Sequence, residues 1–284
     1  MSLKNNFGEK IPFQPMPDDA PLKVMRMTDF CHLTSLCAHR NGFFMLLWTT
    51  SGIGAHRINC RQFDLLPGRL FFTHEGQLHQ MISNPEVGWM IIFKNSFFQQ
   101  YIKLYPEQEQ SGLYDFFTRS PYVNLDACLS DRFNQVVSLM EKETQPNSRV
   151  LISYLSILLY HAAQLHTGTD TPVLNSFQAG QVRRLRTLIN QHYKTQRKAP
   201  FYSSLMGIST RKLNEITSRA FGKLVQDMIS DRLLSESEAM LGQTNLSMKE
   251  IIFELNFAGH AHFASFFKKA KGITPSAFRK QVKT

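Results

Sequence analysis

The sequence predicts a two-domain α+β protein, with an antiparallel β-barrel and trailing helices before an all-α domain. Three observations support this fold class. Short apolar runs separated by Gly, Pro and Asn fill the chain up to about residue 94, helical periodicity follows, and a turn-rich segment at 167–177 precedes a basic helical region. We therefore expect a first domain at 1–166, a linker at 167–177 and a second domain at 178–284.

The barrel is expected at about 20–94, because closely spaced apolar runs bounded by turn formers are typical of antiparallel strands. The candidate strands lie at 43–50, 54–59, 69–73, 77–82 and 89–93. The turn-forming pairs between them are Ser51-Gly52, Pro67-Gly68 and Asn84-Pro85. This spacing favours a barrel or a sandwich.

Helices are expected from about 95 to 166, at 96–105, 130–143 and 149–166. The last of them carries Leu151, Leu155 and Leu158 at helical spacing. This apolar stripe is interpreted as core. Part of it is also open to a role as a dimer seam, because helices that follow a barrel have to bury two apolar faces.

The second domain is predicted to be helical throughout, with helices at 178–193, 199–206, 210–220, 224–241, 248–255 and 260–271. Ser209 or Thr210 is expected to cap the third of these, and Ser247 with Glu250 has the spacing of a capping box. Asn256 occupies a turn position that favours a positive φ. The pattern indicates two helix-turn-helix units in tandem.

Positive charge is concentrated in this second part of the chain. Up to Asp170 there are 14 basic and 15 acidic residues, whereas after it there are 18 basic and 7 acidic residues. The first part is therefore nearly neutral and the second carries a net charge of +11. Such a division favours a polyanion as the partner of the second part, and helix-turn-helix units indicate double-stranded DNA.

The helix at 210–220 presents a polar row that is chemically suited to base recognition. Arg211, Asn214 and Glu215 are expected to contact bases, because Arg binds guanine, Asn binds adenine and Glu accepts from cytosine. Lys212 and Arg219 are expected to contact phosphates. On the helix at 178–193, the side chains expected to face solvent or phosphate are Arg183, Arg184 and Arg186.

Two sets of motifs resemble a known family. The run from His39-Arg40 to Gly76-Gln-Leu-His79, with Pro67-Gly-Arg-Leu-Phe-Phe72 inside it, resembles the cupin-like sensor barrel of AraC/XylS-family regulators. Near the carboxyl end, Glu254-Leu-Asn-Phe257, Phe266-Phe-Lys-Lys269 and Gly272-Ile-Thr-Pro-Ser-Ala-Phe-Arg279 resemble the DNA-binding domain of that family.

The resemblance implies a dimerising sensor domain and a seven-helix DNA-binding domain whose two recognition helices enter successive major grooves. It places His260, His262 and Ser265 in the second recognition helix, and it gives Lys268 and Lys269 phosphate or structural roles. The chain departs from the family pattern at the usual turn glycine, which is Asn256 here. The second recognition helix offers few long polar side chains, so we expect the first to carry most of the sequence discrimination.

A ligand pocket inside the barrel is expected to use His39, Trp48, His56 and His79, because ligand pockets are mostly apolar with a few polar groups. These histidines show no H-x-H pair, so no metal and no cofactor are expected. A hydrogen-bonded structural role is the alternative for each histidine. A metal-dependent cupin enzyme with a basic accessory domain is the alternative for the whole protein.

The chain shows no secretory signal at its start and no apolar run long enough to span a bilayer, which predicts a cytoplasmic protein without a membrane partner. Cys31, Cys37, Cys60 and Cys128 lack C-x-x-C spacing and are interpreted as free thiols in a reducing compartment. A redox pair between Cys31 and Cys37 is an open alternative.

Together these features predict a sequence-specific transcription regulator that is not an enzyme. We expect a homodimeric activator whose first domain responds to a small effector and whose second domain binds promoter DNA and recruits RNA polymerase. A regulator whose barrel only dimerises is the alternative that keeps the DNA-binding role.

Overall fold

The computed structural model describes residues 11–17, 20–30, 38–59, 61–106, 108, 113–114, 118, 120–143, 148–166 and 176–283. The chain folds into two compact units. We call Met1–Gln99, Pro121–Leu158 and Gln243–Leu246 the sheet unit, and Gln100–Ser120, Leu159–Gly242 and Ser247–Thr284 the helical unit. The domain boundaries expected from the sequence stay a prediction, and most of the expected linker lies outside the described residues.

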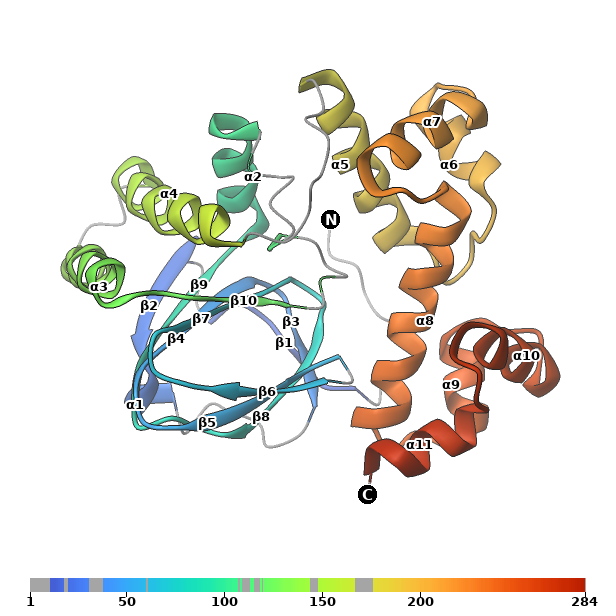
Figure 1. Cartoon of the computed structure of the whole chain (residues 1–284), viewed down its shortest axis with the longest axis horizontal. Helices are drawn as coiled ribbons and strands as arrows, with labels where there is room; N and C mark the ends of the chain where they lie inside the picture. Colours follow the sequence, from blue (N-terminus) through green and yellow to red (C-terminus); the bar gives the residue numbers. More distant parts are fainter. Residues whose placement is uncertain are drawn as a thin grey trace. The chain divides into compact units, whose positions relative to one another are not determined.

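In the described part of the sheet unit, ten strands form two five-stranded sheets (Figure 1). Sheet A has the order β1 (Phe13–Gln14), β3 (His39–Asn41), β8 (Leu78–Ser83), β5 (Gly54–Ile58), β6 (Arg61–Leu65). Sheet B has the order β10 (Tyr122–Asn124), β7 (Arg69–Thr73), β4 (Phe44–Ser51), β9 (Val87–Phe93), β2 (Leu22–Arg26). All strand pairs are antiparallel except β1 with β3.

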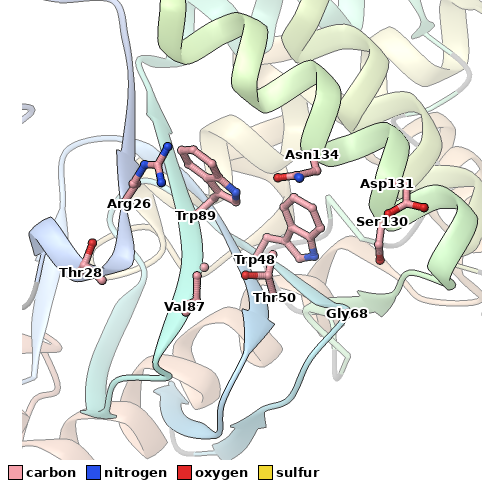
Figure 2. A pocket seen from close by; sticks show the side chains of 11 residues that line it. Arg26, Thr28, Trp48, Thr50, Gly68, Val87, Trp89, Ser130, Asp131 and Asn134 are labelled. Atoms are coloured by element: carbon pink, nitrogen blue, oxygen red, sulfur yellow. The ribbon is translucent and has the colours of Figure 1, made fainter.

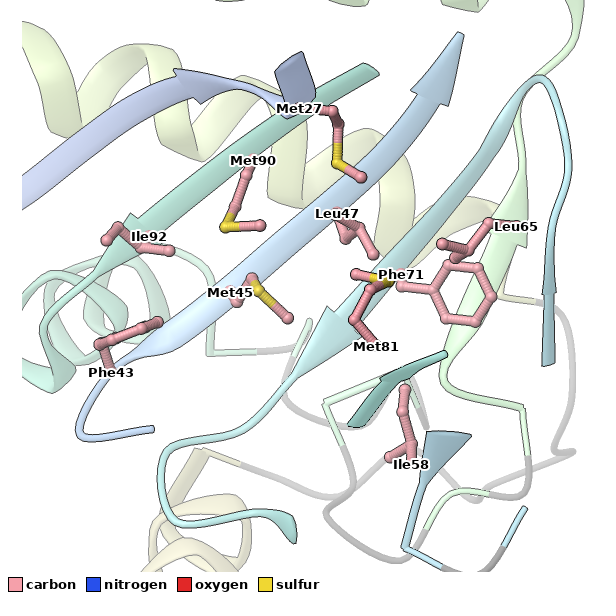
Figure 3. Close-up of a cluster of buried hydrophobic side chains, with 10 residues drawn as sticks. All are labelled: Met27, Phe43, Met45, Leu47, Ile58, Leu65, Phe71, Met81, Met90 and Ile92. Atoms are coloured by element: carbon pink, nitrogen blue, oxygen red, sulfur yellow. The ribbon is translucent and has the colours of Figure 1, made fainter. Parts of the chain in front are cut away.

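The main core of this unit contains side chains from both sheets. Met45 and Leu47 lie two positions apart on β4 and share one face of that strand. Ile58 and Met81 come from β5 and β8 of the other sheet (Figure 3). Because side chains alternate between the two faces of a strand, these residues define the inward face of each sheet. The sheets therefore pack face to face, and the inward-facing apolar residues form a single core.

The opposite face of sheet B is also buried, because helices cover it. The four helices of this region are α1 (Met27–Phe30), α2 (Asn95–Leu104), α3 (Ala127–Lys142) and α4 (Ser148–Leu165). The ring of Phe44 on β4 is tilted against that of Phe98 on α2 at 4.8 Å between centroids, and Trp48 contacts Phe133 of α3 edge-on at 5.9 Å. Burial on both faces explains why β4 reads as an almost continuous apolar run.

The expected closed barrel is wrong, because the strands form two separate sheets. Alternating apolar residues specify which face of a strand is buried, and a sandwich satisfies that pattern as well as a barrel does. All five expected strands are present, with ends shifted by at most two residues. The strands that the sequence did not predict are β1, β2, β3, β6 and β10.

Seven helices occur between residues 176 and 283, all of which are described. They are α5 (Ser176–His192), α6 (Ala199–Met206), α7 (Thr210–Phe221), α8 (Val225–Gln243), α9 (Met248–Glu254), α10 (His260–Lys271) and α11 (Pro275–Lys283). Packing of α6 against α7, and of α9 against α10, forms two helix-turn-helix units. The long helix α8 connects them in the chain (Figure 1).

Local capping signals set the ends of these helices as expected. Ser209 caps α7 by accepting from the backbone N–H of Lys212 at 3.1 Å. Ser247 and Glu250 form the predicted capping box at the start of α9. Asn256 adopts a φ of 54° in the turn before α10, which confirms the expectation of a left-handed residue there.

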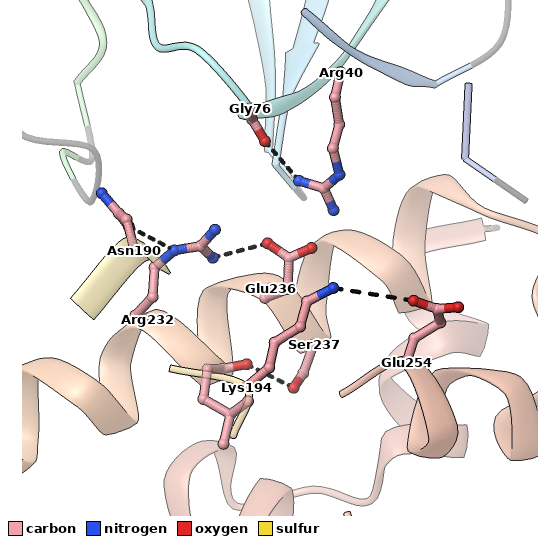
Figure 4. Close-up of polar contacts among 9 residues, drawn as sticks. Arg40, Gly76, Asn190, Lys194, Arg232, Glu236, Ser237 and Glu254 are labelled. Carbon is pink, nitrogen blue, oxygen red and sulfur yellow. Dashed lines mark hydrogen bonds and ion pairs between the residues drawn. The ribbon is translucent and has the colours of Figure 1, made fainter. Parts of the chain in front are cut away.

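Arg232, which is buried in an ion pair within α8, also joins α8 to α5. Arg232 donates to Glu236 Oε2 at 2.8 Å and to Asn190 Oδ1 at 2.9 Å, and its guanidinium lies 4.2 Å from the ring centroid of Tyr193 (Figure 4). The side chains of Arg232 and Glu236 are only 6% and 3% exposed. Removing Glu236 would leave the buried charge of Arg232 uncompensated, whereas the contacts of Arg232 with Asn190 and Tyr193 position α8 against α5.

Candidate nucleic-acid interface and ligand-binding groove

The helix expected to read bases first, α7, presents an exposed polar row to solvent, while Leu213 and Ile216 are buried beneath it. Arg211 has a side chain that is 91% exposed and lies 3.4 Å from Glu215. Lys212 forms a second ion pair with Glu215 at 3.3 Å. Exposed pairs of this kind contribute little to stability, so these side chains can exchange partners when another charged surface approaches.

Asn214 is placed differently from its neighbours. It is half-buried, and its Oδ1 accepts a hydrogen bond of 3.1 Å from the backbone N–H of Val225 at the start of α8. A bidentate contact with adenine requires the carboxamide as both donor and acceptor. The bond to Val225 occupies one of the two acceptor sites of Oδ1. The side chain therefore joins α7 to α8 in addition to any contact with DNA.

The helix expected to be the second reader, α10, also presents its expected residues to solvent. His260, His262 and Ser265 are exposed, whereas Phe263 and Phe267 are buried. The ring of His262 packs edge-on against Phe257 at 5.3 Å, which limits its orientation. Lys268 and Lys269 are exposed in the last turn of this helix.

The three arginines expected on the face of α5 have separate environments. Arg184 donates to the carbonyl of Leu205 at 2.7 Å, and the guanidinium of Arg186 lies 4.5 Å from the ring centroid of Phe221. The side chain of Arg183 lies outside the described residues. Arg184 and Arg186 thus make contacts within the fold that the sequence pattern did not indicate, because their partners are distant in the chain.

Arg197 connects the two helix-turn-helix units, a role that the sequence did not reveal. It precedes α6, and its Nη2 donates to the carbonyls of Leu255 at 2.5 Å and Asn256 at 2.8 Å. Its guanidinium also lies 4.0 Å from the ring centroid of Phe257. Partial burial lowers the pKa of Arg197. The turn before α10 is therefore tied directly to the segment before α6.

In the sheet unit, three of the four expected pocket residues come together. His39, His56 and His79 are buried on neighbouring strands of sheet A. His56 Nε2 and His79 Nδ1 share a hydrogen bond of 3.0 Å, and the rings of His39 and His79 lie 4.3 Å apart. The contact of His56 with Phe71 shows that this cluster faces the space between the two sheets.

Burial favours the neutral form of His56 and of His79. Desolvation, followed by the charge of His39, lowers the pKa of His56 to about 3. The pKa of His79 is also well below its ordinary value, mainly through burial. His56 Nδ1 and His79 Nε2 have no hydrogen-bond partner among the described residues. Within that same part of the chain, no group of three or more His, Cys, Asp and Glu side chains is placed to hold a metal ion.

Trp48 does not belong to this cluster, because it lies on the opposite face of sheet B. It lines a surface groove of about 440 Å³ between that face and α3 (Figure 2). The lining residues are Arg26, Thr28, Trp48, Thr50, Gly68, Val87, Gly88, Trp89, Ser130, Asp131 and Asn134. Except for Trp48, sequence reasoning missed these residues, because their proximity depends on the pairing of β2, β4 and β9 and on the packing of α3.

An ion pair lies at one side of the groove. Arg26 donates from Nε and Nη2 to the two carboxylate oxygens of Glu141 at 2.9 and 3.0 Å. Its guanidinium also lies 4.8 Å from the ring centroid of Trp89. The hydrogen bond from Arg26 is the main cause that lowers the pKa of Glu141, and the same contact raises the pKa of Arg26.

The remaining sequence expectations concern cysteines and membranes. Cys128 is an exposed free thiol, whereas Cys31, Cys37 and Cys60 lie outside the described residues. Among the helices of the described residues, none combines the length and the apolar character that a membrane crossing requires.

Comparisons with known proteins cover both parts of the chain. A family model described as an AraC-like ligand binding domain matches residues 34–163, and one described as a helix-turn-helix domain matches residues 202–281. The arabinose operon regulatory protein of Salmonella typhimurium is 22% identical over 246 residues, which is 83% of each chain. The xylose operon regulatory protein of Escherichia coli K12 is 25% identical over 141 residues, covering 50% of this chain and 34% of that protein.

Among solved structures, ToxT from Vibrio cholerae aligns over 93% of this chain and 98% of its own, at 14% sequence identity. The TM-score of that alignment is 0.42, so the likeness in overall architecture is weak. The two family models together span most of the described chain, and the order in which they match is that of a ligand-binding domain followed by a helix-turn-helix domain.

Proposed function

Because the chain belongs to the AraC family of DNA-binding transcription regulators and carries an AraC-like ligand-binding domain, we propose that it activates transcription by placing α7 and α10 in successive major grooves. The observation that carries this proposal is the exposed polar row of α7 above a buried apolar face, repeated by α10. Two such helices on one face of the duplex lie about 34 Å apart, which is one turn of B-DNA.

Within α7, Arg211 and Glu215 are the residues we assign to bases, and Lys212 and Arg219 are assigned to phosphates. The exposure of all four supports this assignment. Asn214 acts at the same surface through its amide N–H groups while its Oδ1 supports the start of α8. We expect α7 to provide most of the sequence discrimination, because α10 offers only His260, His262 and Ser265 for base contacts.

Phosphate contacts are assigned to Lys268 and Lys269 on α10. Arg279 on α11 has its Nε and Nη2 atoms buried, which favours a structural role for that side chain. Phosphate oxygens are strong acceptors for the ammonium groups of the two lysines. Phosphate contacts fix the register of the protein on DNA without specifying sequence, so substitutions at these positions should affect all duplexes alike.

The effector is proposed to bind the sheet unit, where the buried histidines offer unfilled hydrogen-bonding atoms in an otherwise apolar interior. Binding would favour one of two arrangements of the protein and so change its affinity for promoter DNA. A homodimer is proposed as the active form. The exposed apolar side chains of Leu139 on α3 and Ile157 on α4 support a contact between sensor domains.

Recruitment of RNA polymerase and activation rather than repression are part of the same proposal. The alternative of a metal-dependent enzyme is not favoured, because the curated relatives that match most of the chain are transcription regulators. The alternative of a regulator that only dimerises through its sheet unit is addressed by titration of the purified protein with small molecules.

The recognition assignment is tested by selecting duplexes from a random library and measuring their affinity by fluorescence anisotropy. Arg211→Ala should lose roughly 1–3 kcal/mol on the selected duplex and relax the preference at one base position. Lys268→Ala should weaken all duplexes alike. Lys249→Ala, an exposed substitution on α9, is the matched control. Unchanged sequence preference in Arg211→Ala would refute the assignment.

A further inference from the structure

We propose that Arg197 is a positioning residue for DNA recognition, which holds α10 in a set position relative to α7 before either helix meets DNA. The proposal rests on the function described above, because it requires that both helices contact the duplex. It adds a residue whose own partners are carbonyls and an aromatic ring of the protein. Its basis is a set of contacts that fix both the backbone and the guanidinium of Arg197.

The backbone around Arg197 is fixed to the first helix-turn-helix unit. The hydroxyl of Tyr202, a fully buried residue of α6, donates to the carbonyl of Gln196 at 2.6 Å. Near the start of α8, Gln226 Nε2 donates to the carbonyl of Arg197 itself at 2.8 Å. The backbone N–H of the first residue of α8 is held by Asn214 of α7. Arg197 therefore extends from a backbone that is joined to α6 and, through the start of α8, to α7.

The guanidinium of Arg197 fixes the turn of the second unit. Its Nη2 donates to the carbonyls of Leu255 and Asn256 at 2.5 and 2.8 Å, and its central carbon lies 4.0 Å from the ring centroid of Phe257. Hydrogen bonds from a charged donor are stronger than those between neutral groups, and a cation over an aromatic ring adds to them. A planar guanidinium also loses little rotamer freedom for each bond that it forms. The turn is therefore held in one place relative to the first unit.

Phe257 carries this restraint from the turn into α10. Its ring centroid lies 5.3 Å from that of His262, 5.0 Å from that of Phe263 and 5.3 Å from that of Phe266, all on α10. His262 is one of the residues that we assign to bases. The guanidinium and α10 contact the same ring, so a movement of the turn would also move the side chains that face DNA.

Two ion pairs accompany the contacts of Arg197, and neither restrains the start of α10 as directly. Lys194 and Glu254 lie 4.0 Å apart with side chains that are 38% and 32% exposed, so solvent screens their attraction (Figure 4). Lys271, in the last turn of α10, pairs with Glu238 of α8 at 2.6 Å. That second pair restrains the far end of the helix, whereas the contacts of Arg197 restrain the end that follows the turn.

A preset geometry of two recognition helices raises the effective concentration of the second helix once the first has bound. Loss of Arg197 would remove that gain and leave the contacts of α7 with its own base pairs unaltered. A direct phosphate contact by Arg197 would instead depend on its charge and would strengthen binding to every duplex that reaches it. These two roles can be separated by varying the length of the duplex and the chemistry of the side chain.

The test compares two duplexes by fluorescence anisotropy, with the full chain and with sequences chosen from the selected library. The long duplex carries the base pairs assigned to α7 and to α10, whereas the short duplex ends before the groove that α10 enters. The ratio of their dissociation constants measures the gain from α10. In Arg197→Met this gain should fall by about tenfold, while affinity for the short duplex stays within about twofold of that of the unmodified protein.

Arg197→Lys separates positioning from charge. Lysine keeps the positive charge but lacks the planar group that bonds two carbonyls and covers a ring at once, so the gain should fall by about threefold. This variant also decides the question if thermal denaturation shows that Arg197→Met does not fold. Lys198→Met removes a positive charge from the adjacent exposed position and is the matched control, which should leave the gain unchanged.

An unchanged gain in Arg197→Met, equal weakening of both duplexes, or a full gain in Arg197→Lys would overturn the proposal. The last two results would assign Arg197 to the phosphate backbone instead. A selected library with one preferred block of base pairs rather than two would refute the two-helix recognition on which this proposal rests, so that failure is distinct from a failure of the role of Arg197.

Discussion

At the scale of single residues, the buried histidine pair has the clearest consequence for stability. His56 is fully buried on β5 and shares a hydrogen bond with His79. Its pKa in the folded protein is about 3, against 6.5 for an unburied imidazole. In the unfolded chain the ring takes up a proton below pH 6.5, whereas in the folded chain it stays neutral, so acidification favours unfolding.

We expect the free energy of unfolding of the sheet unit to fall by about 2 kcal/mol between pH 7 and pH 5 on account of His56 alone. The stabilisation is complete above pH 6.5 and is lost as the pH falls from there toward about 3. The depressed pKa of His79 acts in the same direction. Urea denaturation at the two pH values measures the effect.

His56→Gln should reduce this pH dependence, whereas His260→Gln, at an exposed position on α10, should leave it intact. Equal losses of stability on acidification in the unmodified protein and in His56→Gln would contradict the explanation.

A second prediction at this scale concerns Asn214. Replacing it with alanine removes the acceptor for the Val225 N–H at the start of α8, so Asn214→Ala should lower the free energy of unfolding of the helical unit by about 1 kcal/mol. Ser218→Ala, at an exposed position on the same helix, is the control. If thermal denaturation gave the same midpoint for Asn214→Ala and Ser218→Ala, the hydrogen bond of Asn214 would contribute nothing to stability.

The exposure and contacts of a side chain were predictable where they depend on the local sequence. They were less predictable where they depend on partners that are distant in the chain. The exposure of Arg211 and Glu215 follows from helical periodicity, which also placed Leu213 and Ile216 inside. The bond of Asn214 could not be predicted, because its partner lies in the next helix. The separation of Trp48 from the histidines likewise depends on which face of β4 points toward α3.

At the scale of elements, the turn before α10 depends on one residue in a left-handed backbone conformation. Asn256 holds a φ of 54° where a side chain with a Cβ is strained. Asn256→Gly should raise the free energy of unfolding by up to roughly 1 kcal/mol, and Asn256→Ala should lower it by about 1 kcal/mol. Both variants retain the backbone carbonyl that accepts from Arg197.

Chemical denaturation measures these changes, with Lys249→Ala on the neighbouring helix α9 as the control. A glycine variant that is less stable than the alanine variant would exclude backbone strain as the reason.

Helices were predicted more closely than strands, for a physical reason. A helix is marked by its own caps, such as Ser247 with Glu250, and the observed end of α10 coincides with the expected one. A strand is stabilised by partners elsewhere in the chain. The two-residue strand β1 and the three-residue strand β10 carry no periodic signal of their own, so only their pairing with β3 and β7 identifies them.

At the scale of the whole molecule, the uneven charge of the chain should make its affinity for DNA depend on salt concentration. Beyond Asp170 there are 18 basic and 7 acidic residues, and Lys268 and Lys269 are exposed among them. The logarithm of the affinity for DNA should fall linearly with the logarithm of the salt concentration, because each phosphate contact releases counterions.

The double variant Lys268→Ala with Lys269→Ala should reduce the steepness of that line by about 2, because each phosphate that a lysine neutralises adds roughly 0.9 to the slope. Anisotropy titrations over a series of salt concentrations give the slope. Arg132→Ala, an exposed substitution on α3 of the sheet unit, should leave it unchanged. A double variant with the original slope would show that these lysines do not bind phosphates.

The side chain of Arg197 spans both helix-turn-helix units, since it precedes α6 and donates to the two carbonyls at the turn that precedes α10. We therefore expect the distance that the protein requires between the two halves of its operator to depend on this guanidinium. Replacement of Arg197 should change which spacings between half-sites the protein tolerates, and leave unchanged the bases it prefers within each half-site.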